Sequence, residues 1–166
     1  TIPVQATDDY VKQSARLIDQ LLDSQRKVYI EYSNEVWNTI FPQEDYATTE
    51  GRKLAESLGL KVSKKQANSY FYAKRSAEIF ELFERGFGNL RSLTKVVAGQ
   101  TMNPWVLEKI LEGLADTKIN PTGQKADAIA IASYFGGNAV ERLLTQNGQV
   151  SKKNVSILDV EKIDLT

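Results

Sequence analysis

The sequence reads KVYIEYSNEVWN from Lys27 to Asn38, and this stretch decides the fold that we expect. Its first half is rich in β-branched and aromatic residues, which is typical of a β-strand. The run ends abruptly in three polar residues, Ser33, Asn34 and Glu35. Binding and catalytic groups of parallel α/β proteins lie at the carboxyl ends of the strands. Glu35 is therefore the first residue that we expect to take part in chemistry.

Two further apolar runs have strand character, Leu93–Gly99 and Ala126–Ser133. The second is continuously apolar, as strands buried on both faces are. Around these runs, apolar residues recur at helical spacing. We expect helices at residues 7–22, 46–58, 66–87, 103–114 and 139–144. This alternation of helices and strands predicts an α/β fold with parallel strands and right-handed helical crossovers.

The composition excludes several kinds of functional site. The chain has 166 residues, enough for one core of ordinary size, and its 21 Lys and Arg balance 21 Asp and Glu. This balance indicates neither a nucleic acid nor a membrane partner. Neither cysteine nor histidine is present, which excludes disulfides, thiolate or imidazole metal ligands, and a Ser-His-Asp triad within the chain. Acid–base chemistry near neutral pH falls to carboxylates, Lys and Tyr, and we expect neither a metal nor a cofactor.

The two ends of the sequence carry less information. The chain begins Thr-Ile-Pro-Val, without Met and without a readable cleavable signal, so we expect a mature form or a piece of a longer protein. No run of about 18 apolar residues occurs, so we expect no membrane span. Residues 149–166 are polar and form a tail for which we predict no definite structure.

The three expected strands end in residues that suit a carbohydrate ligand. Adjacent parallel strands would bring their carboxyl ends to one rim. The candidate residues on this rim are Asn34, Glu35, Trp37, Asn38, Gln100, Trp105 and Tyr134. Amides and carboxylates form hydrogen bonds with sugar hydroxyls, and indole faces stack on the C–H faces of pyranose rings. This mixture favours a sugar over a phosphate or an apolar ligand.

Each rim residue also has an ordinary structural interpretation. Taken alone, Glu35 would be a solvated loop carboxylate. Trp37 and Trp105 would be core residues, and Tyr134 would be a core residue with a satisfied hydroxyl. Both interpretations stay open at this point.

Two charged positions carry expectations of a different kind. Glu31 lies at strand spacing from the rim and would point into a barrel interior, where it would need a partner such as Lys95 or Arg91. Arg75 and Glu78 have the spacing of a pair on the surface of a helix.

Four blocks of the sequence resemble one known group of proteins. They are VYIEYSNEVWN at 28–38, FYAKRSAEIF at 71–80, GQ with NPW at 99–105, and ADAIAIA followed by YFGG at 126–137. Together they resemble bacterial secreted proteins related to clan A glycoside hydrolases, often labelled cellulose-binding or glycosidase-like. The resemblance covers most of residues 1–140 in order and does not extend into the tail.

The resemblance implies a partial (β/α)8 TIM barrel. Residues 1–148 would run from the end of the third strand to the helix after the sixth, with Asn34 and Glu35 ending the fourth. In that clan the Glu of this pair is the general acid/base, and the Asn before it holds the sugar 2-hydroxyl. The nucleophilic Glu ends the seventh strand, which this chain would lack. The resemblance also implies an extracellular or periplasmic protein.

A retaining glycosidase needs two carboxyl groups about 5–5.5 Å apart. We therefore expect this segment alone to be inactive, and the parent protein to hydrolyse a β-linked polysaccharide with Glu35 as general acid/base. The alternatives are a non-catalytic carbohydrate-binding barrel and a scaffold or interaction domain. The expected partners are a polysaccharide or oligosaccharide, together with the missing half of the barrel or a second copy of this open half.

Overall fold

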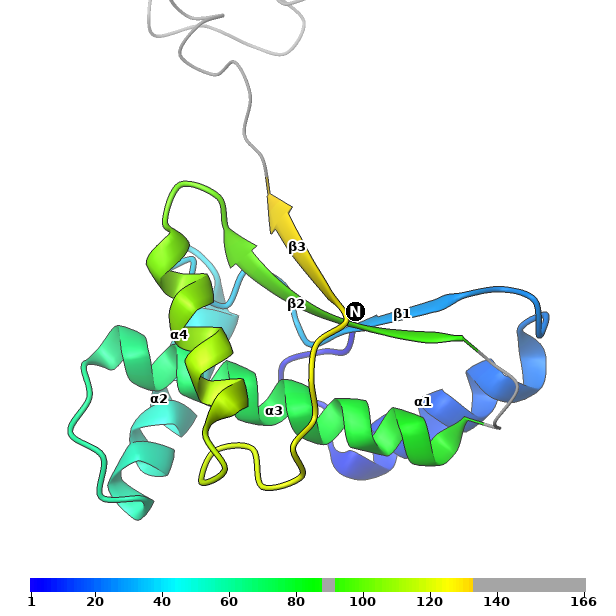
Figure 1. Cartoon of the computed structure of the whole chain (residues 1–166), viewed down its shortest axis with the longest axis horizontal. Coiled ribbons are helices and arrows are strands. Elements are labelled where there is room, and N and C mark those ends of the chain that lie inside the picture. The colour runs from blue at the N-terminus through cyan, green and yellow to red at the C-terminus, as the bar shows by residue number, and fades with distance from the viewer. Residues whose placement is uncertain (88–91, 133–166) are drawn as a thin grey trace, which may run out of the picture. The chain divides into compact units, whose positions relative to one another are not determined.

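The computed structural model describes residues 1–87 and 92–132. Its elements are α1 (Asp8–Leu21), β1 (Val28–Glu31), α2 (Pro42–Ser57), α3 (Lys64–Gly86), β2 (Leu93–Gln100), α4 (Pro104–Ala115) and β3 (Ala128–Ala132) (Figure 1). All the helices and strands expected before residue 132 are present, with bounds that differ by a few residues. The expected helix at 139–144, the tail at 149–166 and Tyr134 lie outside the described residues.

The strands form a parallel sheet in the order β1-β2-β3. The chain start lies along the other edge of β1, where the Ile2 N–H donates to the Glu31 carbonyl (2.8 Å) and the Ser33 N–H donates to the Ile2 carbonyl (2.7 Å). This confirms an α/β fold with parallel strands. The sheet is small and open in the described residues, so the (β/α)8 barrel and the handedness of its crossovers stay predictions.

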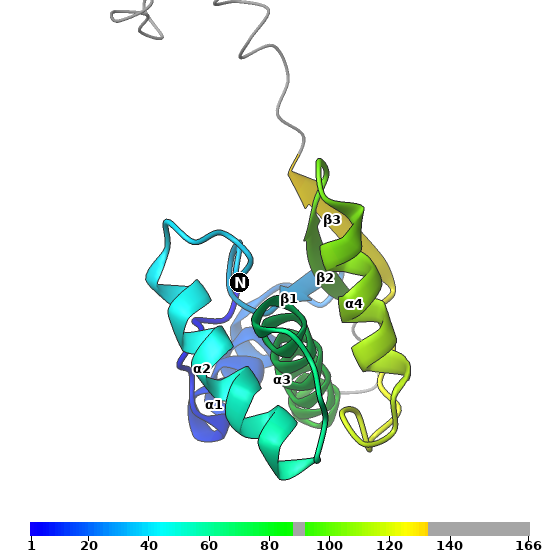
Figure 2. The same cartoon turned by 90° about the vertical axis from the view of Figure 1, so that its left-hand side faces the viewer.

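One face of the sheet is covered by helices. Val28, Ile30 and Tyr32 point to this face and are buried, as is Val97 of β2. Figure 2 looks along α3, with α1 and α2 on one side and α4 on the other. The core therefore lies between the sheet and α3. Apolar side chains continue along the same face in β3, where Ile129 is 50% exposed.

Local sequence signals explain where the helices begin. Thr7 caps α1, and its hydroxyl accepts the Tyr10 N–H (3.2 Å). Pro104 is the first residue of α4, a position where proline is well tolerated. Pro42 has the same role in α2, which therefore begins four residues earlier than the predicted Tyr46.

Glycines allow helices to approach α3 closely, and Gly51 and Gly86 do so for α2 and α1. A Cβ atom at Gly51 of α2 would lie 2.2 Å from the Ala67 carbonyl oxygen. A Cβ atom at Gly86, the last residue of α3, would lie 2.7 Å from the Ala15 Cβ atom of α1. Both contacts leave room for a hydrogen atom only. The packing of α1 and α2 against α3 thus depends on these two positions.

The predicted surface pair of Arg75 and Glu78 is only part of a larger contact. Arg75 does pair with Glu78 (2.9 Å), but its guanidinium also binds Asp8 (2.7 Å) and the Ala6 carbonyl (2.8 Å). The Arg75 side chain is 12% exposed. The surface interpretation was wrong because residues distant in sequence cover this arginine, which joins α3 to the start of α1.

Lys95 is not the partner of Glu31. Its register places it beside Ile30 on the helix-covered face, whereas Glu31 points to the opposite face. There Lys95 donates to Glu84 (2.8 Å) and Gln124 (3.3 Å). The prediction was wrong because successive residues of a strand point to opposite faces. The other candidate, Arg91, lies outside the described residues.

A tyrosine side chain completes the hydrogen bonding of the sheet. Ala98 lies two residues beyond Val96, the last residue of β2 that pairs with β1. Its backbone N–H donates to the Tyr72 hydroxyl (3.0 Å), and Tyr72 is 1% exposed. Burial raises the pKa of the Tyr72 phenol above its ordinary value, so the hydroxyl remains neutral. Tyr72 therefore replaces a strand partner at the point where β1 has ended.

We expect Tyr72→Phe to lower the free energy of unfolding by about 1–3 kcal/mol, because it leaves the Ala98 N–H buried without a partner. Tyr70→Phe is the matched control, since the partly buried Tyr70 hydroxyl interacts with side chains, Gln66 among them (2.8 Å). That change should cost about 0.5 kcal/mol or less. Urea denaturation followed by circular dichroism measures both values. Equal losses in the two variants would contradict the role assigned to Tyr72.

Candidate functional site

The backbone after β1 has an unusual conformation. Ser33 and Glu35 have positive φ angles of 57° and 44°. Residues other than glycine rarely adopt this left-handed region, and they do so mostly where the surrounding structure forces it. Asn34 lies between them and is exposed. Strained residues of this kind gather at functional sites, which makes this turn the first candidate.

Contacts from two segments, the start of the chain and the start of α2, fix the turn. The Ser33 N–H donates to the Ile2 carbonyl, and the Tyr32 hydroxyl donates to the Val4 carbonyl (2.8 Å). On the other side, the Gln43 side chain at the start of α2 donates to the Asn34 carbonyl (2.9 Å). The backbone around Asn34 is thus held from both sides while its side chain faces solvent.

Glu35 and Asn38 are in direct contact. The Asn38 amide donates to a carboxylate oxygen of Glu35 (2.8 Å), and the Asn38 N–H donates to the Glu35 carbonyl (2.9 Å). The Asn38 side-chain oxygen accepts the Ile40 N–H (3.2 Å). The structure therefore brings two predicted site residues together. Asn38 orients the Glu35 carboxylate, in addition to any contact that it makes with a ligand.

Each tryptophan has features of both a core residue and a rim residue, the two interpretations made from the sequence. Trp37 and Trp105 pack against the core and remain partly exposed. The Lys109 ammonium lies 5.9 Å from the centre of the Trp105 ring. Each indole is thus held by the core and still presents part of its surface.

The neighbouring strand brings fewer candidates to the rim. Gln100 is the last residue of β2 and is partly buried, and its carbonyl accepts the Asn103 N–H (3.1 Å). Trp105 follows in the first turn of α4. Because β1 and β2 are parallel, these residues and Glu35 follow strand ends on the same edge of the sheet. Tyr134, predicted to end the third strand, lies outside the described residues.

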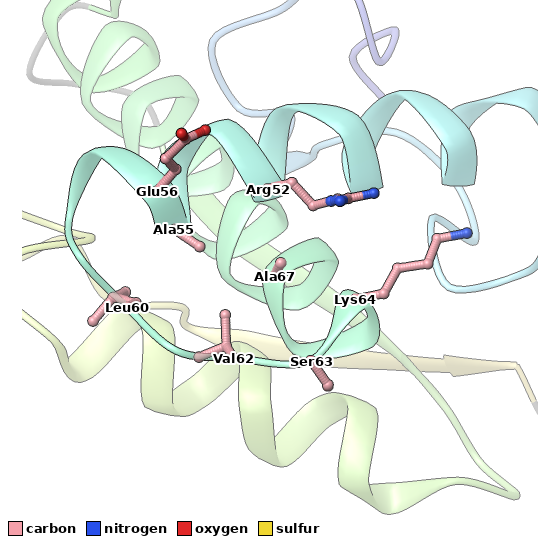
Figure 3. A pocket seen from close by; sticks show the side chains of 8 residues that line it. All are labelled: Arg52, Ala55, Glu56, Leu60, Val62, Ser63, Lys64 and Ala67. Carbon is pink, nitrogen blue, oxygen red and sulfur yellow. The ribbon is translucent and has the colours of Figure 1, made fainter.

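The sequence did not reveal a cavity of about 670 Å³ away from the strand ends. It lies between the second half of α2, the connecting loop and the first turn of α3 (Figure 3). Its lining residues are Arg52, Ala55, Glu56, Leu60, Val62, Ser63, Lys64 and Ala67. None of the predicted rim residues lines it. The cavity arises from the packing of α2 on α3, which no local motif indicates.

Glu31 lies below the rim, on the sheet face that the helices do not cover. Burial raises the pKa of its carboxyl above the ordinary value of 4.5, and the positive charge of the chain's first amino group partly opposes this shift. The ionised form of Glu31 is therefore disfavoured in the folded protein.

A raised carboxyl pKa destabilises the folded state as the pH rises through the interval between the unfolded and folded values. We expect Glu31→Gln to raise the free energy of unfolding near pH 7. The gain should disappear below about pH 4, where the carboxyl is protonated in both states. Thermal melts at several pH values measure this. A gain of the same size at low pH would show that ionisation is not its cause.

Two other kinds of site are not seen in residues 1–87 and 92–132. No three acidic side chains there gather in a way that could hold a metal ion. No helix in this part of the chain has the length and apolar character to cross a membrane.

Comparison of the chain with models of protein families, with curated proteins and with solved structures finds no match.

Proposed function

We propose that this chain is part of a glycoside hydrolase-like barrel that hydrolyses a β-linked polysaccharide, with Glu35 as general acid/base. The observation that carries the proposal is the strained turn at the end of β1. It presents a carboxylate oriented by Asn38 beside an exposed amide, that of Asn34. The resemblance of residues 28–38 to bacterial secreted proteins related to clan A glycoside hydrolases supports the same assignment.

The proposed chemistry assigns a role to each group. Glu35 protonates the glycosidic oxygen as the bond to the sugar breaks, and later removes a proton from the attacking water. The Asn34 amide binds a sugar hydroxyl close to the reacting carbon. Trp37, Trp105, Gln100 and Tyr134 line the sugar-binding rim, where indole faces stack on pyranose rings.

The nucleophile is assigned to a part of the protein outside this chain. Glu35 is the only acidic residue in the two segments that link β1 to α2 and β2 to α4. A retaining mechanism needs a second carboxylate about 5–5.5 Å away. The segment alone is therefore inactive under this proposal, and the parent protein acts on its polysaccharide in the extracellular or periplasmic space.

The decisive test compares the intact parent protein with its Glu35→Gln variant on aryl glycosides and polysaccharides. We expect the variant to lose about 10²–10⁴-fold in kcat, since it cannot transfer the proton. Glu50→Gln is the matched control, because Glu50 lies on α2 and pairs with Lys53 (2.7 Å). Equal activity of the Glu35→Gln variant and the wild type would remove Glu35 from catalysis.

One observation favours a second candidate, a barrel that binds carbohydrate without hydrolysing it. The Glu35 carboxylate already accepts a hydrogen bond from Asn38, as a carboxylate with a purely structural or binding role would. This candidate keeps the rim and its tryptophans and assigns no proton transfer to Glu35.

Titration of the 166-residue chain with β-linked oligosaccharides separates the candidates. We expect binding to change the fluorescence of Trp37 and Trp105, and Asn34→Ala to weaken it about tenfold through loss of an amide contact. Binding without hydrolysis by the intact protein would favour the second candidate. Neither binding nor hydrolysis would indicate a scaffold or interaction domain.

A further inference from the structure

A buried asparagine of α3 contacts the loop that carries Glu35. Asn68 is 4% exposed. Its side-chain nitrogen donates to the Val36 carbonyl (3.0 Å) and lies within hydrogen-bond distance of the Glu44 carbonyl (3.3 Å) and the Thr48 hydroxyl (3.2 Å). Val36 directly follows Glu35 and is 1% exposed. Asn68 therefore joins this loop and the first turns of α2 to the central helix.

The polarity of this cluster requires a donor at position 68. The Thr48 hydroxyl donates its own hydrogen to the Glu44 carboxylate (3.0 Å), so it can only accept from Asn68. Carbonyl oxygens are also acceptors. Lys64 lies 3.9 Å from the same Glu44 oxygen and supplies the compensating charge. An aspartate at position 68 would place a further acceptor against all three partners.

The position of the Val36 carbonyl constrains the residue before it. This carbonyl is part of the peptide group between Val36 and Trp37, so the contact from Asn68 fixes the chain one residue beyond Glu35 and its left-handed backbone. Gln43 and Ile2 hold the residues just before Glu35, and Asn68 holds the residue just after it. The short segment that contains Glu35 is thus anchored at both ends, by Gln43 at the Asn34 carbonyl and by Asn68 at the Val36 carbonyl.

We propose that Asn68 is the positioning residue of the Glu35 loop: its amide holds the Val36 carbonyl and so sets where the Glu35 carboxylate lies. The effect on the loop does not depend on what the protein does. The consequence for hydrolysis rests on the function proposed above.

The chain offers a matched control. Asn120 is 2% exposed, and its side-chain nitrogen donates to the Leu114 carbonyl (2.7 Å) and the Gln124 carbonyl (2.8 Å) in the connection between α4 and β3. Asn120→Asp makes the same chemical change as Asn68→Asp, at a similar depth and in another part of the fold. Both variants should be less stable than the wild type.

Hydrogen exchange measured by mass spectrometry on the 166-residue chain tests the loop directly. We expect peptides covering residues 34–41 to exchange at least tenfold faster in Asn68→Asp, because their amide hydrogen bonds depend on the anchored Val36. In Asn120→Asp the same peptides should exchange as in the wild type, after correction for global stability. Should Asn68→Asp fail to fold, Asn68→Ser removes the amide without adding a charge and takes its place.

Kinetics on the intact parent protein supply a second readout. We expect Asn68→Asp to lower kcat about tenfold or more while KM changes little, since misplacement of a catalytic group slows the chemical step. Asn120→Asp should leave kcat unchanged.

Two results would overturn the inference: unchanged exchange in residues 34–41 of both Asn68 variants, or equally fast exchange in Asn120→Asp. Faster exchange confined to the Asn68 variants supports it. That result, in a parent protein without hydrolytic activity, would reject the proposed hydrolysis and keep the positioning role.

Discussion

Three polar side chains on one face of α3 hold the described part of the chain together. Asn68, Tyr72 and Arg75 follow one another at helical spacing and are all largely buried. Each contacts a different distant segment: the loop after β1, the end of β2, and the start of α1. Apolar packing holds α3 against the sheet. The three polar contacts fix the positions of the loop after β1, the end of β2 and the start of α1 relative to α3. A buried donor without an acceptor is costly, so each contact admits few alternative arrangements.

This arrangement explains how a strained turn persists beside the sheet. Positive φ angles at two non-glycine residues cost on the order of 1–3 kcal/mol each. Hydrogen bonds surround the turn and offset that cost: the Ile2 carbonyl accepts from the turn, and the Gln43 and Asn68 side chains donate to it. The strain is thus confined to the segment that carries Asn34 and Glu35, while the sheet beneath it keeps regular pairing.

The sequence predicted what depends on neighbouring residues and missed what depends on distant ones. The parallel strands and the places of the helices before residue 132 follow from local patterns, and the structure confirms them. The partners of Arg75 and Lys95 involve segments far away in the sequence, so spacing along one element misassigned them.

The same distinction applies to the site. The polar end of β1 was visible in the sequence, because a strand pattern stops there. The contact between Asn38 and Glu35 depends on the left-handed backbone at Glu35, which no residue type indicates. The role of Asn68 could not be predicted from the sequence for a different reason. A helical pattern counts it as one more residue of a long helix, and only the folded chain shows that it faces the loop.

The close approach of α2 to α3 has a consequence for mutational tolerance. The backbone of α3 lies so near Gly51 that any larger residue there must push the two helices apart. Ala67, the residue that it would strike, is the neighbour of Asn68. A substitution on α2 would therefore displace the donor that fixes the Val36 carbonyl. A substitution at position 51 would therefore disturb the candidate site, although Gly51 contributes no atom to the rim.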